Sequence, residues 1–148
     1  MQTASFPHAR PADDSRQWAA GMHVGALVLA LLTSWISGLA GALVAGIVYL
    51  ARRDDDPFVA AHAREALNFH LSMCVYACAI FMTGIALLGA TVLTLGIGAI
   101  VTLPVGLLLA VAAVGLVVLW LVSSILAAVH AWNGEHYLHP MTMRFFGG

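Results

Sequence analysis

The stretch that decides the fold runs from Ala66 to Gly134 and reads ALNFHLSMCVYACAIFMTGIALLGATVLTLGIGAIVTLPVGLLLAVAAVGLVVLWLVSSILAAVHAWNG. It contains 69 residues without a single Asp, Glu, Lys or Arg. A membrane-spanning helix needs about 20 predominantly apolar residues, so this stretch has room for two helices and a connection. Glycines and Pro104 interrupt the apolar pattern near its middle, and proline is favoured in the first turn of a helix. The sequence therefore predicts membrane helices over residues 65–90 and 104–132.

The composition of the whole chain agrees with a membrane protein. Of its 148 residues, 61% are hydrophobic and 9% are charged, whereas a soluble domain averages about 45–50% apolar and about 25% charged residues. Disordered chains are polar and rich in charge, so the same numbers exclude disorder. A net charge of −1 provides no basic surface for a nucleic acid, and two cysteines cannot form a disulfide framework. We therefore expect an all-α integral membrane protein in contact with the lipid bilayer.

A second stretch without charged residues covers residues 17–51. As one helix it would be about 52 Å long, well beyond the hydrocarbon thickness of about 30 Å. Turn-forming residues and an interfacial tryptophan lie between Thr33 and Gly38 and divide it. The sequence therefore predicts two short spans, 17–33 and 37–51, and a total of four.

The charged residues fall into three segments, which are the N-terminus, a central loop with the residue that follows it, and the C-terminus. Four crossings place all three segments on one side of the membrane, and the positive-inside rule makes that side the cytoplasm. We predict a mobile cytoplasmic tail over residues 1–16 and a membrane domain over 17–146 with a cytoplasmic loop at 52–64. Both termini are then cytoplasmic, in a multi-pass protein of a bacterial inner membrane.

The central loop carries a motif in which each residue favours the start of a helix: Arg52-Arg53-Asp54-Asp55-Asp56-Pro57-Phe58. Asp56 can cap a helix whose first residue is Pro57, and the acidic residues before it suit the positive end of the helix dipole. That helix could continue directly into the third span. Carboxylates also bind Mg²⁺ or Ca²⁺, but consecutive residues at a cap diverge and the arginine pair supplies counter-charge. We therefore prefer a solvated cap and predict no metal.

A stripe of polar residues follows one side of the predicted third helix. At about 100° per residue the stripe comprises Glu65, Asn68, Ser72, Tyr76 and Thr83. Because lipid offers no hydrogen-bond partners, such a stripe faces the interior of a helix bundle. It could line a polar pathway or a ligand site, or it could hold the helices together. His23 lies at a similar depth and completes a predicted polar cluster, in which Glu65 and Asn68 bond to the loop after Arg52 or to the first helix.

Three histidines lie at about equal depth inside three predicted spans, which could suit haem ligation by two of them. Helical phase argues against this use of His70 and His130. His70 lies about 140° from the polar stripe, and His130 lies away from the small-residue face of its helix. We expect both side chains to extend to the lipid headgroups and predict no cofactor.

The loop motif and the C-terminus resemble a bacterial membrane family of unknown function. That family is described as similar to the twenty-kilodalton subunit of the chloroplast inner-envelope protein-import translocon (Tic-type). The residues that carry the resemblance lie between 17 and 146: Trp18, Ala19, His23, Tyr49–Val59, His62, Arg64–Phe69, Ala127, Ala128, Ala131, Asn133–Glu135 and Tyr137–Pro140. The resemblance implies four membrane helices with cytoplasmic termini and no accepted enzymatic activity. His70 and His130 stand where the family pattern has glutamine and lysine, and the segment 89–104 is longer than usual.

Two classes of function agree with these observations. The first is a non-enzymatic membrane protein that packs against copies of itself or against other membrane proteins, as an accessory subunit of a complex. The second is an oligomeric channel or a conduit like a protein translocon, lined by the polar stripe. An intramembrane enzyme or redox protein is a third, less favoured class, because the sequence contains no catalytic motif.

Overall fold

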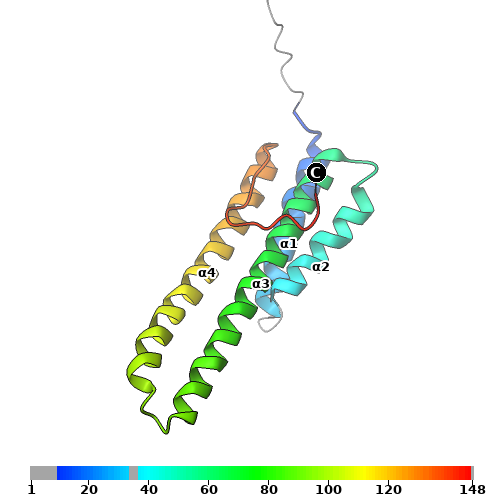
Figure 1. Ribbon diagram of the computed structural model, residues 1–148. Coiled ribbons are helices and arrows are strands. Elements are labelled where there is room, and N and C mark those ends of the chain that lie inside the picture. The colour runs from blue at the N-terminus through cyan, green and yellow to red at the C-terminus, as the bar shows by residue number, and fades with distance from the viewer. Residues whose placement is uncertain (1–9, 34–36, 148) are drawn as a thin grey trace, which may run out of the picture.

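The computed structural model describes residues 10–33 and 37–147, and these residues form four helices (Figure 1). The helices are α1 (Asp13–Leu32), α2 (Ser37–Arg52), α3 (Pro57–Leu93) and α4 (Ala99–Asn133). None of the residues in these two ranges lies in a β-strand. The predicted all-α class is therefore confirmed, with one helix in the place of each predicted span.

The four helices form two hairpins of very different length. α1 has 20 residues and α2 has 16, whereas α3 has 37 and α4 has 35. The α1–α2 hairpin packs along the half of α3 that contains its N-terminus, and α3 and α4 continue alone beyond it (Figure 1). Among the described residues α1 and α3 each contact all three of the other helices, whereas α2 and α4 do not pack against each other.

The start of α3 agrees with the prediction from the loop motif. Oδ1 of Asp56 accepts hydrogen bonds from the backbone N–H groups of Phe58 and Val59, both at 3.1 Å, and Pro57 occupies the first turn. The helix then continues without a break, so the segment 57–64 is helical and only four residues connect α2 to α3.

The other helix boundaries differ from the predicted spans by a few residues. α1 begins at Asp13, within the predicted N-terminal tail, since two aspartates in its first turn interact favourably with the helix dipole. The first nine residues of that tail lie outside the described residues, as does most of the predicted turn between α1 and α2, at residues 34–36.

The turn between α3 and α4 is tight, and Leu95 (φ 52°) and Gly96 (φ 89°) adopt left-handed backbone conformations in it. α4 begins at Ala99, and Pro104 lies inside the helix, so the predicted helix start at Pro104 is wrong. Proline removes only one backbone N–H from the ladder of a helix. A helix of 35 residues tolerates that loss so close to its start.

Two of the four described helices, α3 and α4, are long and apolar enough to cross a membrane. At about 1.5 Å per residue α3 is about 55 Å long, close to twice the hydrocarbon thickness of about 30 Å. α2 is apolar but short, and α1 contains three charged residues in its first turn. Helix length and composition therefore support two spans, and the predicted total of four is not established by them.

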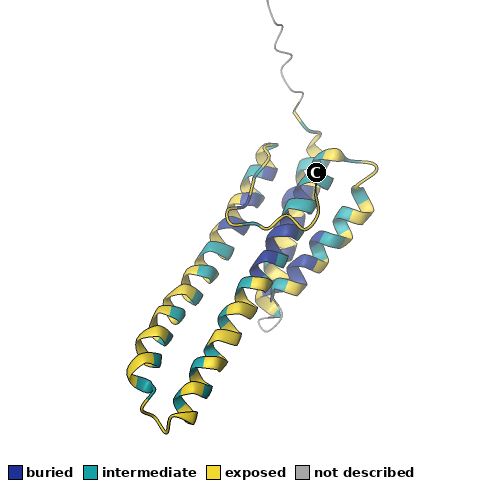
Figure 2. Ribbon diagram, viewed as in Figure 1, coloured by how far each residue is buried: buried dark blue, intermediate teal, exposed yellow. Residues whose placement is uncertain are grey.

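The core of the protein lies at the end of the bundle that holds the charged residues. Figure 2 shows that buried residues gather where α1 and α2 meet α3 and the last turns of α4, whereas the far halves of α3 and α4 are exposed. The apolar side chains with no exposed surface are mostly alanines: Ala19, Ala45, Val59, Ala63, Ala66, Phe69, Ala127 and Ala131. Such small side chains let helix backbones approach closely, which is how membrane helices pack.

Candidate functional site

The residues after α4 form an extended segment that crosses from α4 to α3, and we call Gly134–Gly147 the C-terminal strap (Figure 1). Gly134 ends α4 in the left-handed conformation, with φ of 80°, and Glu135 N–H bonds back to the carbonyl of His130. Proline at position 140 and a positive φ at Met141 keep the strap irregular. An irregular backbone beside apolar helices needs partners for its N–H and C=O groups.

Asn68 supplies three of these partners. Its Oδ1 accepts hydrogen bonds from the backbone N–H groups of Phe145 (3.1 Å) and Phe146 (2.9 Å), and its Nδ2 donates to the carbonyl of Phe146 (3.1 Å). Glu65 lies one turn nearer the start of α3, and its Oε1 accepts from the N–H of His139 at 3.1 Å. Asn68 is only 2% exposed, and all three hydrogen bonds of its amide group go to the strap.

Ser72 and Tyr76 extend the same row of contacts along α3. Oγ of Ser72 donates to the carbonyl of Asn68 at 2.7 Å and accepts from the N–H of Met143 at 2.8 Å. The Tyr76 hydroxyl donates to the carbonyl of Met141 at 2.8 Å. Thr83 lies beyond the strap and bonds only within its own helix. Four of the five residues of the predicted polar stripe therefore bind the C-terminal strap.

The partner that the sequence suggested for this stripe is wrong. Within the described part of the chain Glu65 and Asn68 bond neither to the loop after Arg52 nor to α1, because their hydrogen bonds go to the strap. The strap residues that the stripe binds are separated from it by 65–78 positions in the chain. The strap residues bind through their backbone N–H and C=O groups. Every residue type has these groups, so no pattern of side chains in the sequence identifies the strap as the partner.

His23 is buried, and its hydrogen-bond partner is another histidine, His62. Nε2 of His23 lies 3.2 Å from Nδ1 of His62, whose Nε2 lies 3.1 Å from the carbonyl of Glu135. A carbonyl only accepts, so Nε2 of His62 carries the proton. In the neutral ring Nδ1 then accepts the proton of His23, and the chain of hydrogen bonds joins α1, α3 and the strap.

His139 anchors the strap beneath this pair. Its ring stacks on Phe69, with 4.3 Å between the ring centroids, and lies 5.8 Å from the ring of His23. Burial, and to a smaller extent the nearby His70 and His62, lowers the pKa of His139 from 6.5 to about 3. The strap is therefore attached through a neutral imidazole. In the sequence this residue is marked only as part of the run Tyr137–Pro140 of the family resemblance.

The expectation that His70 extends to the headgroups is wrong, because α2 covers that side of α3. The His70 ring is 2% exposed and fits against Gly41, where any side chain would collide with it. His130 does lie at the surface, where its Nδ1 is 2.7 Å from a carboxylate oxygen of Glu135 and its ring stacks on Tyr137.

Metal-binding side chains do not converge within the parts of the chain that the structure describes, residues 10–33 and 37–147. No group of three or more His, Cys, Asp or Glu side chains there could hold a metal ion. In the loop motif Asp56 is used as a helix cap, and Asp54 pairs with Arg53 at 3.4 Å in an exposed position. The close histidines are joined by ring stacking and one hydrogen bond instead.

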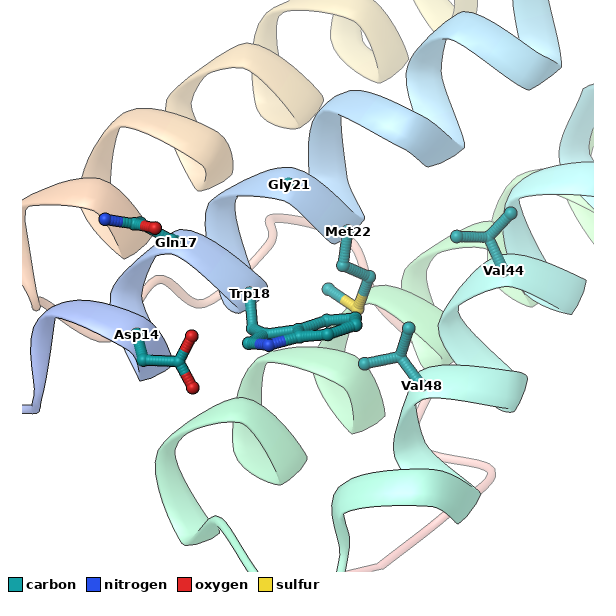
Figure 3. A pocket seen from close by; sticks show the side chains of 7 residues that line it. All are labelled: Asp14, Gln17, Trp18, Gly21, Met22, Val44 and Val48. Carbon is teal, nitrogen blue, oxygen red and sulfur yellow. The ribbon is translucent and has the colours of Figure 1, made fainter.

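A groove lies between α1 and α2, with a volume of about 410 Å³. Figure 3 shows the carboxylate of Asp14 on one side of the Trp18 indole, and Met22 and Val48 on the other. The guanidinium of Arg52 lies 4.3 Å from the centre of the Trp18 ring, a cation–π contact. An amphipathic tryptophan at this level is typical of the membrane–water interface.

These features define a small helical membrane protein whose polar stripe is closed by its own C-terminal strap. The chain belongs to the magnetosome magnetite crystal formation protein family (MamF/MmsF), whose sequence model matches residues 14–146. The matched range includes all but the first residue of α1, the other three helices and nearly all of the strap. No curated protein and no solved structure matches the chain.

The family assignment confirms the predicted kinship only in its coarse form, as a bacterial family of small helical membrane proteins. The comparisons give no support to the expected similarity to a chloroplast translocon subunit. The loop motif and the end of α4, which suggested that similarity, lie inside the range that the magnetosome family matches.

Proposed function

We propose that the protein is a non-catalytic accessory protein of the membrane in which magnetite crystals form. The family match over residues 14–146 is the observation that carries this proposal. In this role the protein acts by packing against copies of itself or against other membrane proteins of the same compartment. The exposed apolar halves of α3 and α4 offer surface for such contacts and for lipid.

The strap supports an accessory role over the alternative of a conduit. A polar pathway along α3 requires side chains that face water or a solute. The strap backbone instead forms hydrogen bonds with the polar side chains of this stripe, Glu65, Asn68, Ser72 and Tyr76. Their hydrogen bonds stabilise the fold instead. Reconstitution in liposomes separates the two roles, since a conduit predicts a conductance that changes in Glu65→Gln and an accessory protein predicts none.

We further propose four crossings with both termini in the cytoplasm. The charged residues of the described chain lie at one end of the bundle, and the turn of α3–α4 at the other end carries none. The short α1–α2 hairpin is accommodated by local thinning of the bilayer beside the longer pair. Single-cysteine labelling at positions 5, 55 and 147 should then occur only from the cytoplasmic face. Labelling of position 55 from the opposite face contradicts this topology.

The size of magnetite crystals in living cells tests the proposed accessory role. The chain would be expressed in a magnetosome-forming bacterium that lacks its own members of the family, and crystal lengths would be measured by electron microscopy. We expect the size distribution to shift towards that of the parent strain. A protein that reaches the membrane at normal levels without changing crystal size or number contradicts the proposal. Purification in mild detergent with mass spectrometry should in parallel recover a stable complex.

A further inference from the structure

A partly enclosed pocket lies between the first turns of α3 and the strap, with a volume of about 280 Å³. The charged, amide and imidazole side chains that line it come from both α3 and the strap: His62, Arg64, Glu65, Asn68, His136 and Arg144. It lies at the charged end of the bundle, beside the last charged residue before the long apolar part of α3. This is the level at which phospholipid headgroups meet a membrane protein.

The charge of the pocket favours an anion. It is lined by two arginines, Arg64 and Arg144, and by one carboxylate, Glu65. One oxygen of that carboxylate already accepts the N–H of His139. The lining therefore carries one formal positive charge in excess, in a pocket that is partly open to solvent.

Several strong donors in the pocket are still available. Arg64 makes one long contact, 3.4 Å, from Nη1 to the carbonyl of Gly147, which leaves its other N–H groups without a partner among the described residues. The guanidinium of Arg144 has no hydrogen-bond partner in the same part of the chain, nor has the His136 ring, which stacks on His62 and Phe58. A planar guanidinium matches the oxygens of a phosphate in a two-point contact.

The remaining polar groups shape the pocket rather than bind in it. The Asn68 amide makes three hydrogen bonds to the strap, and both ring nitrogens of His62 are engaged, with His23 and with the carbonyl of Glu135. These contacts hold the side chains of His62 and Asn68 in place within the lining. The pocket thus combines fixed polar side chains with two arginines that still have donors for a ligand.

We propose that this pocket binds a phosphate group, with Arg64 and Arg144 as its cationic ligands and His136 as a further donor. The phosphate could belong to the headgroup of an anionic phospholipid or to free inorganic phosphate. Basic pockets between membrane helices commonly hold lipid headgroups, and their affinity rests on the same arginine–phosphate chemistry. The proposal does not depend on the role in crystal formation.

The test uses the full chain in a neutral detergent and follows thermal unfolding by tryptophan fluorescence. Phosphatidylglycerol, phosphatidylcholine and inorganic phosphate are added in separate arms, with chloride at equal ionic strength as the reference. A ligand at about 100 times its Kd should raise the melting temperature by about 5–10 °C. We expect this shift in at least one phosphate arm and its loss in Arg64→Gln/Arg144→Gln. Arg53→Gln, in the exposed loop outside the pocket, is the matched control and should keep it.

The arms identify the source of the phosphate. A shift with phosphatidylglycerol alone assigns the site to a lipid headgroup, and a shift with inorganic phosphate assigns it to the free anion. No shift of the melting temperature with phosphatidylglycerol or with inorganic phosphate, or an equal shift in the double variant, overturns the proposal. If the double variant does not fold, Arg144→Gln alone decides, because this side chain is exposed. Lipid or phosphate that co-purifies in equal amount with this single variant and with wild type also overturns the proposal.

Discussion

Replacing Asn68 by leucine should detach the C-terminal strap while leaving the helices folded. The side chain makes three hydrogen bonds to strap backbone, and each contributes about 0.5–1.5 kcal/mol net. Because Phe145 and Phe146 are themselves exposed, their backbone groups can bind water once released. We therefore expect the substitution to weaken strap attachment by about 1.5–3 kcal/mol, the lower part of the range summed over three hydrogen bonds. The population of the detached strap rises by about 10- to 150-fold.

Amide hydrogen exchange measures this population directly. In wild type the N–H groups of Met143, Phe145 and Phe146 are protected by bonds to α3, and in Asn68→Leu all three should exchange faster by about the factor above. Trypsin cleavage after Arg144 should accelerate in parallel, since the protease needs an unbound chain. The matched control is Thr83→Val, which removes a hydroxyl that bonds only within α3. Unchanged exchange in Asn68→Leu, or equal acceleration in the control, refutes the assignment of the strap to the polar stripe.

Three further predictions follow from buried contacts. Gly41→Ala should lower the stability by about 1–3 kcal/mol because its methyl group collides with the His70 ring, and adding His70→Ala should recover part of the loss in a thermal melt. Burial holds the pKa of His139 at about 3, below its unfolded value of 6.5, so the unfolded strap binds protons first. The free energy of strap attachment, measured by hydrogen exchange, is then at its full value above pH 6.5 and falls by up to about 1.4 kcal/mol per pH unit towards pH 3. A pH profile that stays equally steep in His139→Phe contradicts this. Asp56→Ala should cost about 1 kcal/mol through loss of the α3 cap, whereas Asp55→Ala, with no side-chain bond in the described structure, should leave the melting temperature nearly unchanged.

The sequence alone determined the features that depend on neighbouring residues. Long stretches without charge predicted α3 and α4, and Asp56 followed by Pro57 predicted where α3 begins. Helical phase placed Glu65, Asn68, Ser72 and Tyr76 on one face, which they share. Each of these inferences needs only the geometry of one helix and the absence of hydrogen-bond partners in lipid.

The tertiary structure alone decided what that face contacts. The strap has no periodicity, and it binds through backbone N–H and C=O groups that every residue carries, so no residue pattern marks it as the partner. Helical phase likewise gave the direction of His70 relative to the stripe, but whether that direction meets lipid or another helix depends on where α2 packs. Gly41 makes room there for the His70 ring, because it has no side chain. Contacts between segments far apart in the chain are set by packing, and packing is a property of the whole molecule.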